Sequence, residues 1–249
     1  MALDSTGCAI LFWTSPLDGE DRGTVLHRCA FSHNLSVQYN YAYNAEYWLR
    51  YPTLVINPSR HALAVCQSQL TSNPDAAELC MFRYDEMGAA VYTSNPLTMG
   101  MSSSVTYSES LIDQEGNIHV LTNQAGNLSW LKASPIGTLL LGPICLETDI
   151  GTYGNMDFLL GLDNNVHICF ADVSGGQTDI FYIRMDTSGV LQDATQQVTF
   201  SSEVEANPAV GVFPSGEMAL AYREQTGQAL YRAFPKHVCP AAATAFGPR

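Results

Sequence analysis

The stretch DFLLGLDNNVHICFADV, residues 157–173, decides the fold of this chain. It has the pattern of an apolar strand, a tight polar turn and a second strand of alternating character. The same order recurs in three further segments: PTLVINPSRHALAVCQSQ at 52–69, SESLIDQEGNIHVLTNQ at 108–124 and PAVGVFPSGEMALAYRE at 208–224. ALDSTGCAILFWTS at 2–15 enters the pattern halfway along its first strand. The chain is therefore built from an internal repeat.

The repeat has a period of about fifty residues. Its turn anchors are separated by 53, 56, 49 and 51 residues; they are Gly7, Arg60, Gly116, Asn165 and Gly216. Each unit continues into a third strand, such as DIFYIRMD at 179–186, and then a less regular fourth strand. No stretch has a helical period, and glycine and proline fall at the turns. This pattern predicts an all-β chain folded as a five-bladed β-propeller of four-stranded antiparallel blades.

A propeller suits strands that are apolar on both sides, because each blade covers the face of its neighbour. We expect a single domain over residues 1–249. The expected blades are approximately residues 1–46, 47–98, 99–148, 149–200 and 201–249. The first blade lacks most of its innermost strand. Either the tail at 237–249 completes it, or the chain is a piece of a longer protein.

The repeat unit resembles the blades of BNR-type and sialidase-like propeller repeats. The similarity is greatest over residues 157–234, where the third strand has the form YIRMDTSG. The Asp-box of that group, S-x-D-x-G-x-T-W, is absent, and MDTSG at 185–189 stands in its turn position. The resemblance therefore implies the fold and says little about sialidase chemistry.

Composition narrows the possible partners. Eleven Lys and Arg against 24 Asp and Glu give a net charge of −13, which argues against nucleic acid and anionic membranes. No apolar run is long enough for membrane insertion, and the N-terminus has no basic segment of the kind that begins a signal peptide. The seven cysteines are widely spaced, which indicates buried free thiols compatible with a reducing compartment. No cofactor or metal site is predicted.

Two polar features repeat from unit to unit. A basic residue occurs in every third strand; these residues are Arg28, Arg83, Lys132, Arg184 and Arg232. We interpret them as structural side chains that pair with turn carboxylates, and the alternative is a ring of cations around an anionic ligand. Turn carboxylates recur at Asp4, Asp113 and Asp163. We interpret them as turn-opening residues, and the alternative is a set of catalytic carboxylates.

The aromatic stretch VQYNYAYNAEYWLRYP at 37–52 is the predicted ligand-binding surface; its candidate residues are Tyr39, Tyr41, Tyr43, Tyr47 and Trp48. The first three alternate and should share one face of an outer strand. Tyr47, Trp48 and Tyr51 are expected in the loop that crosses to the second blade. Packing between blades is the competing interpretation of the cluster. The crossing loops expected at 95–109 and 147–158 have the composition of adaptable recognition loops.

These features favour a non-catalytic binding module that recognises a glycan or a protein through its rim loops. A glycosidase or sialidase-like hydrolase on the same fold is the first alternative. A structural docking component of a larger assembly, such as a virion or surface complex, is the second.

Overall fold

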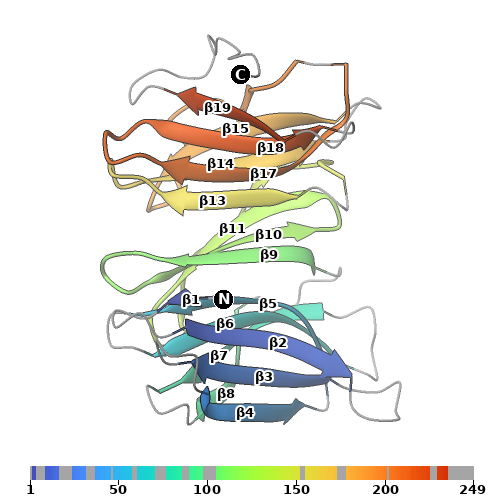
Figure 1. The fold of residues 1–249 in the computed structure, drawn as a ribbon, viewed down its shortest axis with the longest axis vertical. Helices are drawn as coiled ribbons and strands as arrows, with labels where there is room; N and C mark the ends of the chain where they lie inside the picture. Colours follow the sequence, from blue (N-terminus) through green and yellow to red (C-terminus); the bar gives the residue numbers. More distant parts are fainter. Residues whose placement is uncertain are drawn as a thin grey trace. The chain divides into compact units, whose positions relative to one another are not determined.

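The computed structural model describes residues 2–3, 9–16, 24–31, 37–45, 47–57, 61–70, 77–85, 90–97, 105–151, 155–172, 178–200, 202–224 and 229–234. The regular elements in this part of the chain are β-strands, which confirms the all-β class (Figure 1). They form antiparallel sheets in which each strand pairs with its neighbours in sequence. Within the described residues, four sheets have four strands and one has three. No helix in these ranges has the length and apolar character needed to cross a membrane.

The strands follow the repeat along the chain. The first sheet contains β1 (Ala2–Leu3), β2 (Ala9–Pro16), β3 (Thr24–Phe31) and β4 (Val37–Ala45). The second contains β5 (Tyr47–Ile56), β6 (Ala62–Leu70), β7 (Ala77–Tyr84) and β8 (Ala90–Pro96). The third contains β9 (Val105–Ile112), β10 (Ile118–Gln124), β11 (Asn127–Ala133) and β12 (Leu139–Glu147). The fourth contains β13 (Met156–Leu160), β14 (Asn165–Asp172), β15 (Asp179–Asp186) and β16 (Gln196–Gln197), and the fifth contains β17 (Glu205–Val212), β18 (Met218–Glu224) and β19 (Ala229–Phe234).

The turn between the first and second strands has one backbone requirement. Its third or fourth residue takes a left-handed conformation, with φ of 83° at Gly116 and 85° at Gly216. In the fourth sheet this position belongs to Asn164, with φ of 59°, and not to the predicted anchor Asn165. Asparagine tolerates this conformation better than most other non-glycine residues. Because two asparagines follow each other in the sequence DNN, the predicted anchor was placed one residue too far along the chain. Gly7 and Arg60 lie outside the described residues.

The prediction that Tyr47, Trp48 and Tyr51 lie in a loop before the second sheet is wrong. Tyr47 and Trp48 pair with Leu70 and Gln69, so they belong to strand β5, as does Tyr51. The ladder shifts register between Arg50 and Thr53, and this bulge takes Pro52 into the strand without requiring an amide hydrogen from it. The crossing loop expected at 95–109 is also shorter than predicted, because β8 extends to Pro96 and β9 begins at Val105.

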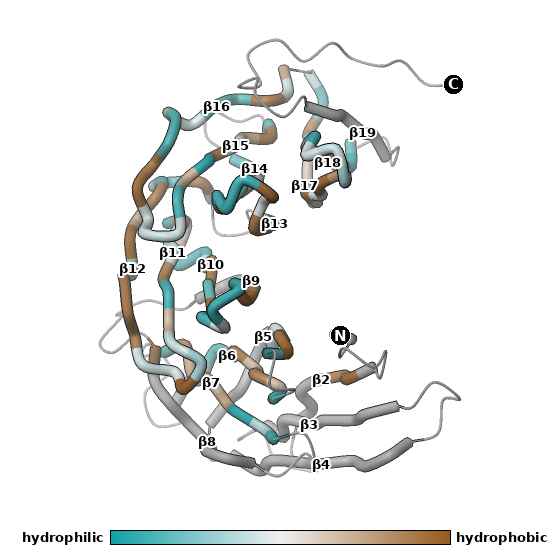
Figure 2. The backbone as a smooth tube through the Cα atoms, turned by 90° about the vertical axis from the view of Figure 1, so that its left-hand side faces the viewer, coloured by the Kyte–Doolittle hydropathy of each residue, from teal (hydrophilic) through white to brown (hydrophobic). Residues whose placement is uncertain are grey.

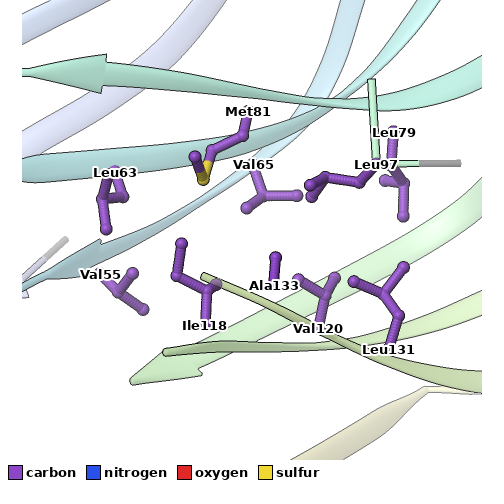
Figure 3. Close-up of a cluster of buried hydrophobic side chains, with 10 residues drawn as sticks. All are labelled: Val55, Leu63, Val65, Leu79, Met81, Leu97, Ile118, Val120, Leu131 and Ala133. Atoms are coloured by element: carbon purple, nitrogen blue, oxygen red, sulfur yellow. The ribbon is translucent and has the colours of Figure 1, made fainter. Parts of the chain in front are cut away.

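The chain divides into two compact units: residues 1–125 with 130–143, and residues 126–129 with 144–249. In the first unit, side chains on the two faces of β6 enter two different cores. Ala62, Ala64 and Cys66 pack beside Ile10, whereas Leu63 and Val65 pack in the core that contains Ile118 and Val120 from β10 (Figure 3). The second sheet is therefore covered on both faces, as strands that are apolar on both sides require.

The second unit has the same kind of core between its sheets. Cys169 and Ile180 of the fourth sheet lie in one buried cluster with Met218, Leu220 and Tyr222 of the fifth. The cysteines follow the prediction in part. Cys66, Cys80 and Cys169 are buried free thiols, but Cys145 is exposed on β12.

Apolar residues on β12, the last strand of the third sheet, are exposed and not buried. Much of this strand is hydrophobic in composition (Figure 2), and yet Leu139, Leu140 and Leu141 are all exposed. The chain therefore has leucines that are fully buried and leucines that are exposed. Replacing one of each kind measures how much burial between sheets contributes to stability.

We predict that Leu63→Ala lowers the free energy of unfolding by about 2–5 kcal/mol, because the residue is fully buried between two sheets. Leu140→Ala, at a side chain that is 48% exposed, should change it by no more than about 0.5 kcal/mol. Urea denaturation of both variants measures the difference. Equal losses would contradict face-to-face packing as the source of stability.

Candidate functional site

A buried polar cluster lies at the turn between β9 and β10. Asp113 Oδ1 accepts a hydrogen bond of 2.7 Å from the Asn117 amide, and its Oδ2 accepts one of 3.0 Å from Asn117 Nδ2. Oδ2 also lies 3.1 Å from His119 Nε2 and 2.9 Å from Lys132 Nζ. Asp113 is 3% exposed and His119 is fully buried. The carboxylate tolerates burial because donors and a cation surround it.

An equivalent cluster lies at the turn between β13 and β14. Asp163 Oδ1 is 3.0 Å from His167 Nε2, and His167 Nδ1 is 2.6 Å from the Tyr182 hydroxyl. Arg184 Nη2 lies 2.8 Å from Asp193 Oδ2, and its Nη1 lies 4.0 Å from Asp163 Oδ2. In the third sheet, the position of Tyr182, two residues before the cation, is occupied by a tryptophan.

The environment of each group fixes its protonation. Burial acts to raise the pKa of Asp113, but hydrogen bonds from Lys132, Asn117 and His119 outweigh it and hold the pKa well below its usual value. Burial lowers the pKa of His119, so the neutral ring donates its Nε2 hydrogen to Asp113. Burial likewise acts to raise the pKa of Asp163, and hydrogen bonds bring that pKa down to about 2. Burial raises the pKa of Tyr182, so its phenol stays protonated and donates to the histidine.

A hydroxyl, an imidazole and a carboxylate in sequence can activate a nucleophile. The equivalent cluster in the third sheet argues against that use. There Trp130 takes the place of Tyr182, with its ring centroid 5.5 Å from that of His119, and a tryptophan side chain cannot act as a nucleophile. The hollow beside Asp163 and His167 has a volume of about 20 Å³, which is room for one water molecule. Gly161 also closes over this cluster, because a Cβ there would clash with both side chains. We interpret both clusters as parts that hold turn and sheet together.

Three of the five repeated basic residues have described side chains. Lys132 and Arg184 contact turn carboxylates as given above, and Arg83 Nη2 lies 2.9 Å from His61 Nδ1. The side chains of Arg28 and Arg232 lie outside the described residues, as does Asp4. Asp113 and Asp163 act as hydrogen-bond acceptors within their own turns. Among the side chains that the structure describes, no group of three or more His, Cys, Asp or Glu is placed to hold a metal.

A cavity of about 460 Å³ lies between β5 and β9, the first strands of their sheets, in the first unit. It is lined by residues 52–54 and 107–110. The Tyr107 hydroxyl donates a hydrogen bond of 2.7 Å to Glu109 Oε1. On the alternate face of β9, the Ser110 hydroxyl lies 2.7 Å from the Thr53 hydroxyl and links the two strands. Tyr107 and Glu109 thus bring an aromatic ring and a carboxylate to one face of β9, whereas the hydroxyls of Ser108 and Ser110 lie on its other face.

Both strands beside this cavity have an irregularity in their hydrogen-bonded ladders. β5 has its bulge between Arg50 and Thr53, and β9 shifts register between Tyr107 and Val105. Bulges bend a strand and re-aim its side chains, and they are common next to functional sites. Strand β17, the first strand of the fifth sheet, has a comparable shift between Ala206 and Ala209. There, Asn155 hydrogen-bonds Asn207, and Asp157 Oδ2 accepts a 2.7 Å hydrogen bond from the Val210 amide.

The predicted aromatic surface is only partly described. Tyr39, Tyr41 and Tyr43 occupy alternate positions of β4, opposite Ala30, Arg28 and Leu26 of β3. Their side chains, and those of Tyr47 and Trp48, lie outside the described residues. The cavity residues were missed by the sequence analysis. No local signal marked them, because SVTYSES at 104–110 has polar counterparts in TYGNMDF at 152–158 and VEANPAV at 204–210, at the same distance before the turn.

Comparison with known proteins shows the fold. No family model matches the chain, and neither does any curated protein. A protein of unknown function from Dyadobacter fermentans is 12% identical, with a TM-score of 0.63 over 99% of this chain and 81% of the other. A PL25 ulvan lyase is 11% identical, with a TM-score of 0.62 over 94% and 68% of the two chains. An intramolecular trans-sialidase from Ruminococcus gnavus is 13% identical, with a TM-score of 0.52 over 85% and 50%. The similar structures are β-propellers, among them glycoside hydrolases and lyases.

We predict that Asp113→Asn lowers the free energy of unfolding at pH 7 by about 2–4 kcal/mol, because it removes a charge that pairs with Lys132. The depressed pKa gives a second expectation. Folded Asp113 stays ionised while the unfolded residue takes up a proton near its ordinary pKa of about 3.9, so its contribution is lost as pH falls through that range. The variant should therefore lose less stability than the wild type between about pH 5 and pH 2.

Urea denaturation across this pH range measures both effects. Asp149→Asn is the matched control, since Asp149 is exposed and its φ of 60° suits asparagine. An Asp113→Asn variant with wild-type stability and wild-type pH dependence would show that the cluster does not stabilise the sheet.

Proposed function

We propose that this chain is a five-bladed β-propeller module that binds a glycan without cleaving it. The observation that carries the proposal is the cavity of about 460 Å³ between β5 and β9, a size typical of small-molecule sites. The five sheets of the described residues and the fifty-residue repeat support the blade number. The propeller fold in common with carbohydrate-active enzymes supports the class of ligand.

The chemistry of the lining suits a sugar. Serine and threonine hydroxyls both donate and accept hydrogen bonds, which matches the hydroxyl groups of a glycan. The carboxylate of Glu109 accepts hydrogen bonds, and the ring of Tyr107 offers an apolar surface beside a polar edge. A protein partner would need a larger area than one cavity of this size offers.

Binding is favoured over hydrolysis by the number of acidic groups. Most glycosidases place two carboxylates on either side of the scissile bond. Among the described residues that line the cavity, Glu109 is the single carboxylate. The turn carboxylates Asp113 and Asp163 are engaged within their own sheets.

One observation supports the hydrolase as a second candidate. Tyr107 donates its hydroxyl hydrogen to Glu109, and a phenol beside a proton acceptor can serve as a nucleophile and base pair. A hydrolase would release reducing sugar from the glycan that it binds, and Tyr107→Phe would abolish the release. A binding module releases none.

We predict that Glu109→Ala weakens binding of the glycan selected on a glycan array by at least about tenfold, because it removes the one carboxylate among the described lining residues. Glu115→Ala is the matched control, since Glu115 is exposed in the turn at the other end of β9 and should bind as the wild type does. Isothermal titration calorimetry measures both affinities. Equal affinities for the wild type and Glu109→Ala, or an array without any bound glycan, would rule out this cavity as the site.

The aromatic stretch remains a second predicted contact surface, formed by Tyr39, Tyr41, Tyr43, Tyr47 and Trp48. We expect the double variant Tyr41→Ala with Tyr43→Ala to weaken partner binding while its melting temperature stays close to that of the wild type. An exposed tyrosine contributes contact area at a small cost in rotamer freedom. A melting temperature several degrees lower, with unchanged binding, would assign these residues to the core.

A further inference from the structure

We infer that Cys66 of β6 and Cys80 of β7 form a redox-sensitive pair, which a low-molecular-weight disulfide oxidises to a cross-strand disulfide. The two cysteines lie directly opposite each other in the antiparallel ladder of the second sheet. Both are reduced thiols in this structure. The inference concerns the second sheet alone and does not depend on glycan binding.

The ladder brings the two cysteines within reach of each other. Residues directly opposite in an antiparallel ladder have Cα atoms about 4.5–5.5 Å apart, and their side chains project from the same face of the sheet. A disulfide joins residues whose Cα atoms are about 4.4–6.8 Å apart. Cys66 and Cys80 accordingly belong to one buried cluster, together with Ala64 and Phe82. The spacing of the backbone therefore already suits the bond.

The Cβ atoms have to approach each other for the bond to form. Opposite Cβ atoms lie about 4.5–5.5 Å apart in a ladder, whereas a disulfide brings them to about 3.8 Å. The neighbouring ladders are weakened on both sides of the pair. The partners of Val65 and Gln67 flank the bulge of β5, so Cys66 lies opposite that bulge. Cys80 pairs on its other side with Pro96, which has no amide hydrogen to donate.

Burial determines when the bond forms. Cys66 is fully buried and Cys80 is 5% exposed. Burial raises the pKa of the Cys66 thiol, and the neighbouring Cys80 acts in the same direction, so this thiol is protonated and shielded in the folded chain. Exchange therefore takes place while the chain folds or when these strands open, and the closed bond is then shielded in turn.

The reaction is thiol–disulfide exchange with oxidised glutathione as the oxidant. The thiolate of one cysteine attacks a glutathione sulfur, breaks the glutathione S–S bond and releases one glutathione thiolate. The thiolate of the second cysteine then attacks the cysteine sulfur of the mixed disulfide and releases the second glutathione. The two cysteine sulfurs are oxidised, and one oxidised glutathione is reduced to two glutathione molecules, which take up the two thiol protons.

The bond closes a ring of 15 residues, from Cys66 to Cys80. A covalent ring of this size reduces the conformational freedom of the unfolded chain, and the strain of drawing the strands together offsets part of that gain. We expect the oxidised chain to unfold at a urea concentration at least about 0.5 M higher than the reduced chain. Dithiothreitol should return the midpoint to that of the reduced chain.

The test refolds the full chain from urea in a buffer of oxidised and reduced glutathione. Remaining thiols are alkylated, the chain is digested without reductant, and mass spectrometry identifies the linked peptides. We expect the main link to join the peptides that contain Cys66 and Cys80. In parallel, the native chain is incubated with oxidised glutathione at a urea concentration just below the midpoint, where the same link should accumulate more slowly.

Two variants assign the gain in stability to this pair. Cys80→Ala should leave Cys66 alkylated and remove the difference between the urea midpoints of the oxidised and reduced chains. Cys145→Ala is the matched control, because Cys145 is an exposed thiol on β12, and this variant should keep both the link and the difference. Each variant is compared with itself under the two redox conditions, so a change in its basal stability does not affect the result.

Several results would overturn the inference. One is alkylation of both Cys66 and Cys80 after oxidation, and another is a main link from either of them to a different cysteine. An oxidised chain that has the bond but lacks the far-ultraviolet circular dichroism of the reduced chain would show that the bond does not fit the ladder. If the chain does not refold from urea, the same peptide map of the native incubation decides the question.

Discussion

The fold depends on burying both faces of the middle strands. In β6 the small residues Ala62 and Ala64 face one neighbouring sheet, and the larger Leu63 and Val65 face the other. A single four-stranded sheet could not remove both faces from water, so each sheet needs a neighbour to be stable. The fifty-residue repeat is the sequence consequence of this requirement, since every unit presents similar faces to the next.

Because the sheet faces are buried, polar residues lie at the turns and along the first strands of the sheets. At the turn end, Asp113 and Lys132 satisfy each other and the backbone, so these charges stabilise the structure and are withdrawn from ligands. At strands β5 and β9, Tyr107 and Glu109 line a cavity, and Ser110 links the two strands by its contact with Thr53. The division explains why the repeated charged residues are structural in our account, whereas the proposed site has no counterpart in every repeat.

Local pattern was sufficient to predict the strands but not the site. Alternation and turn chemistry placed the hairpin around residues 157–173, and only the left-handed residue was misplaced, because Asn164 and Asn165 are indistinguishable by composition. The bulge that carries β5 through Pro52 has no local signature, so Tyr47 was expected in a loop. The cavity depends on two strands more than fifty residues apart, as the Thr53–Ser110 hydrogen bond illustrates, and no single window of sequence contains that neighbourhood.

The central claim is that the hollow between β5 and β9 is where a glycan binds. A crystal structure of the chain soaked with the oligosaccharide it binds best tests this claim most directly. Our account predicts density for a sugar ring bounded by residues 52–54 and 107–110, with a sugar hydroxyl within hydrogen-bonding distance of Glu109. A sugar bound only elsewhere on the chain, with this cavity empty of it, would contradict the account.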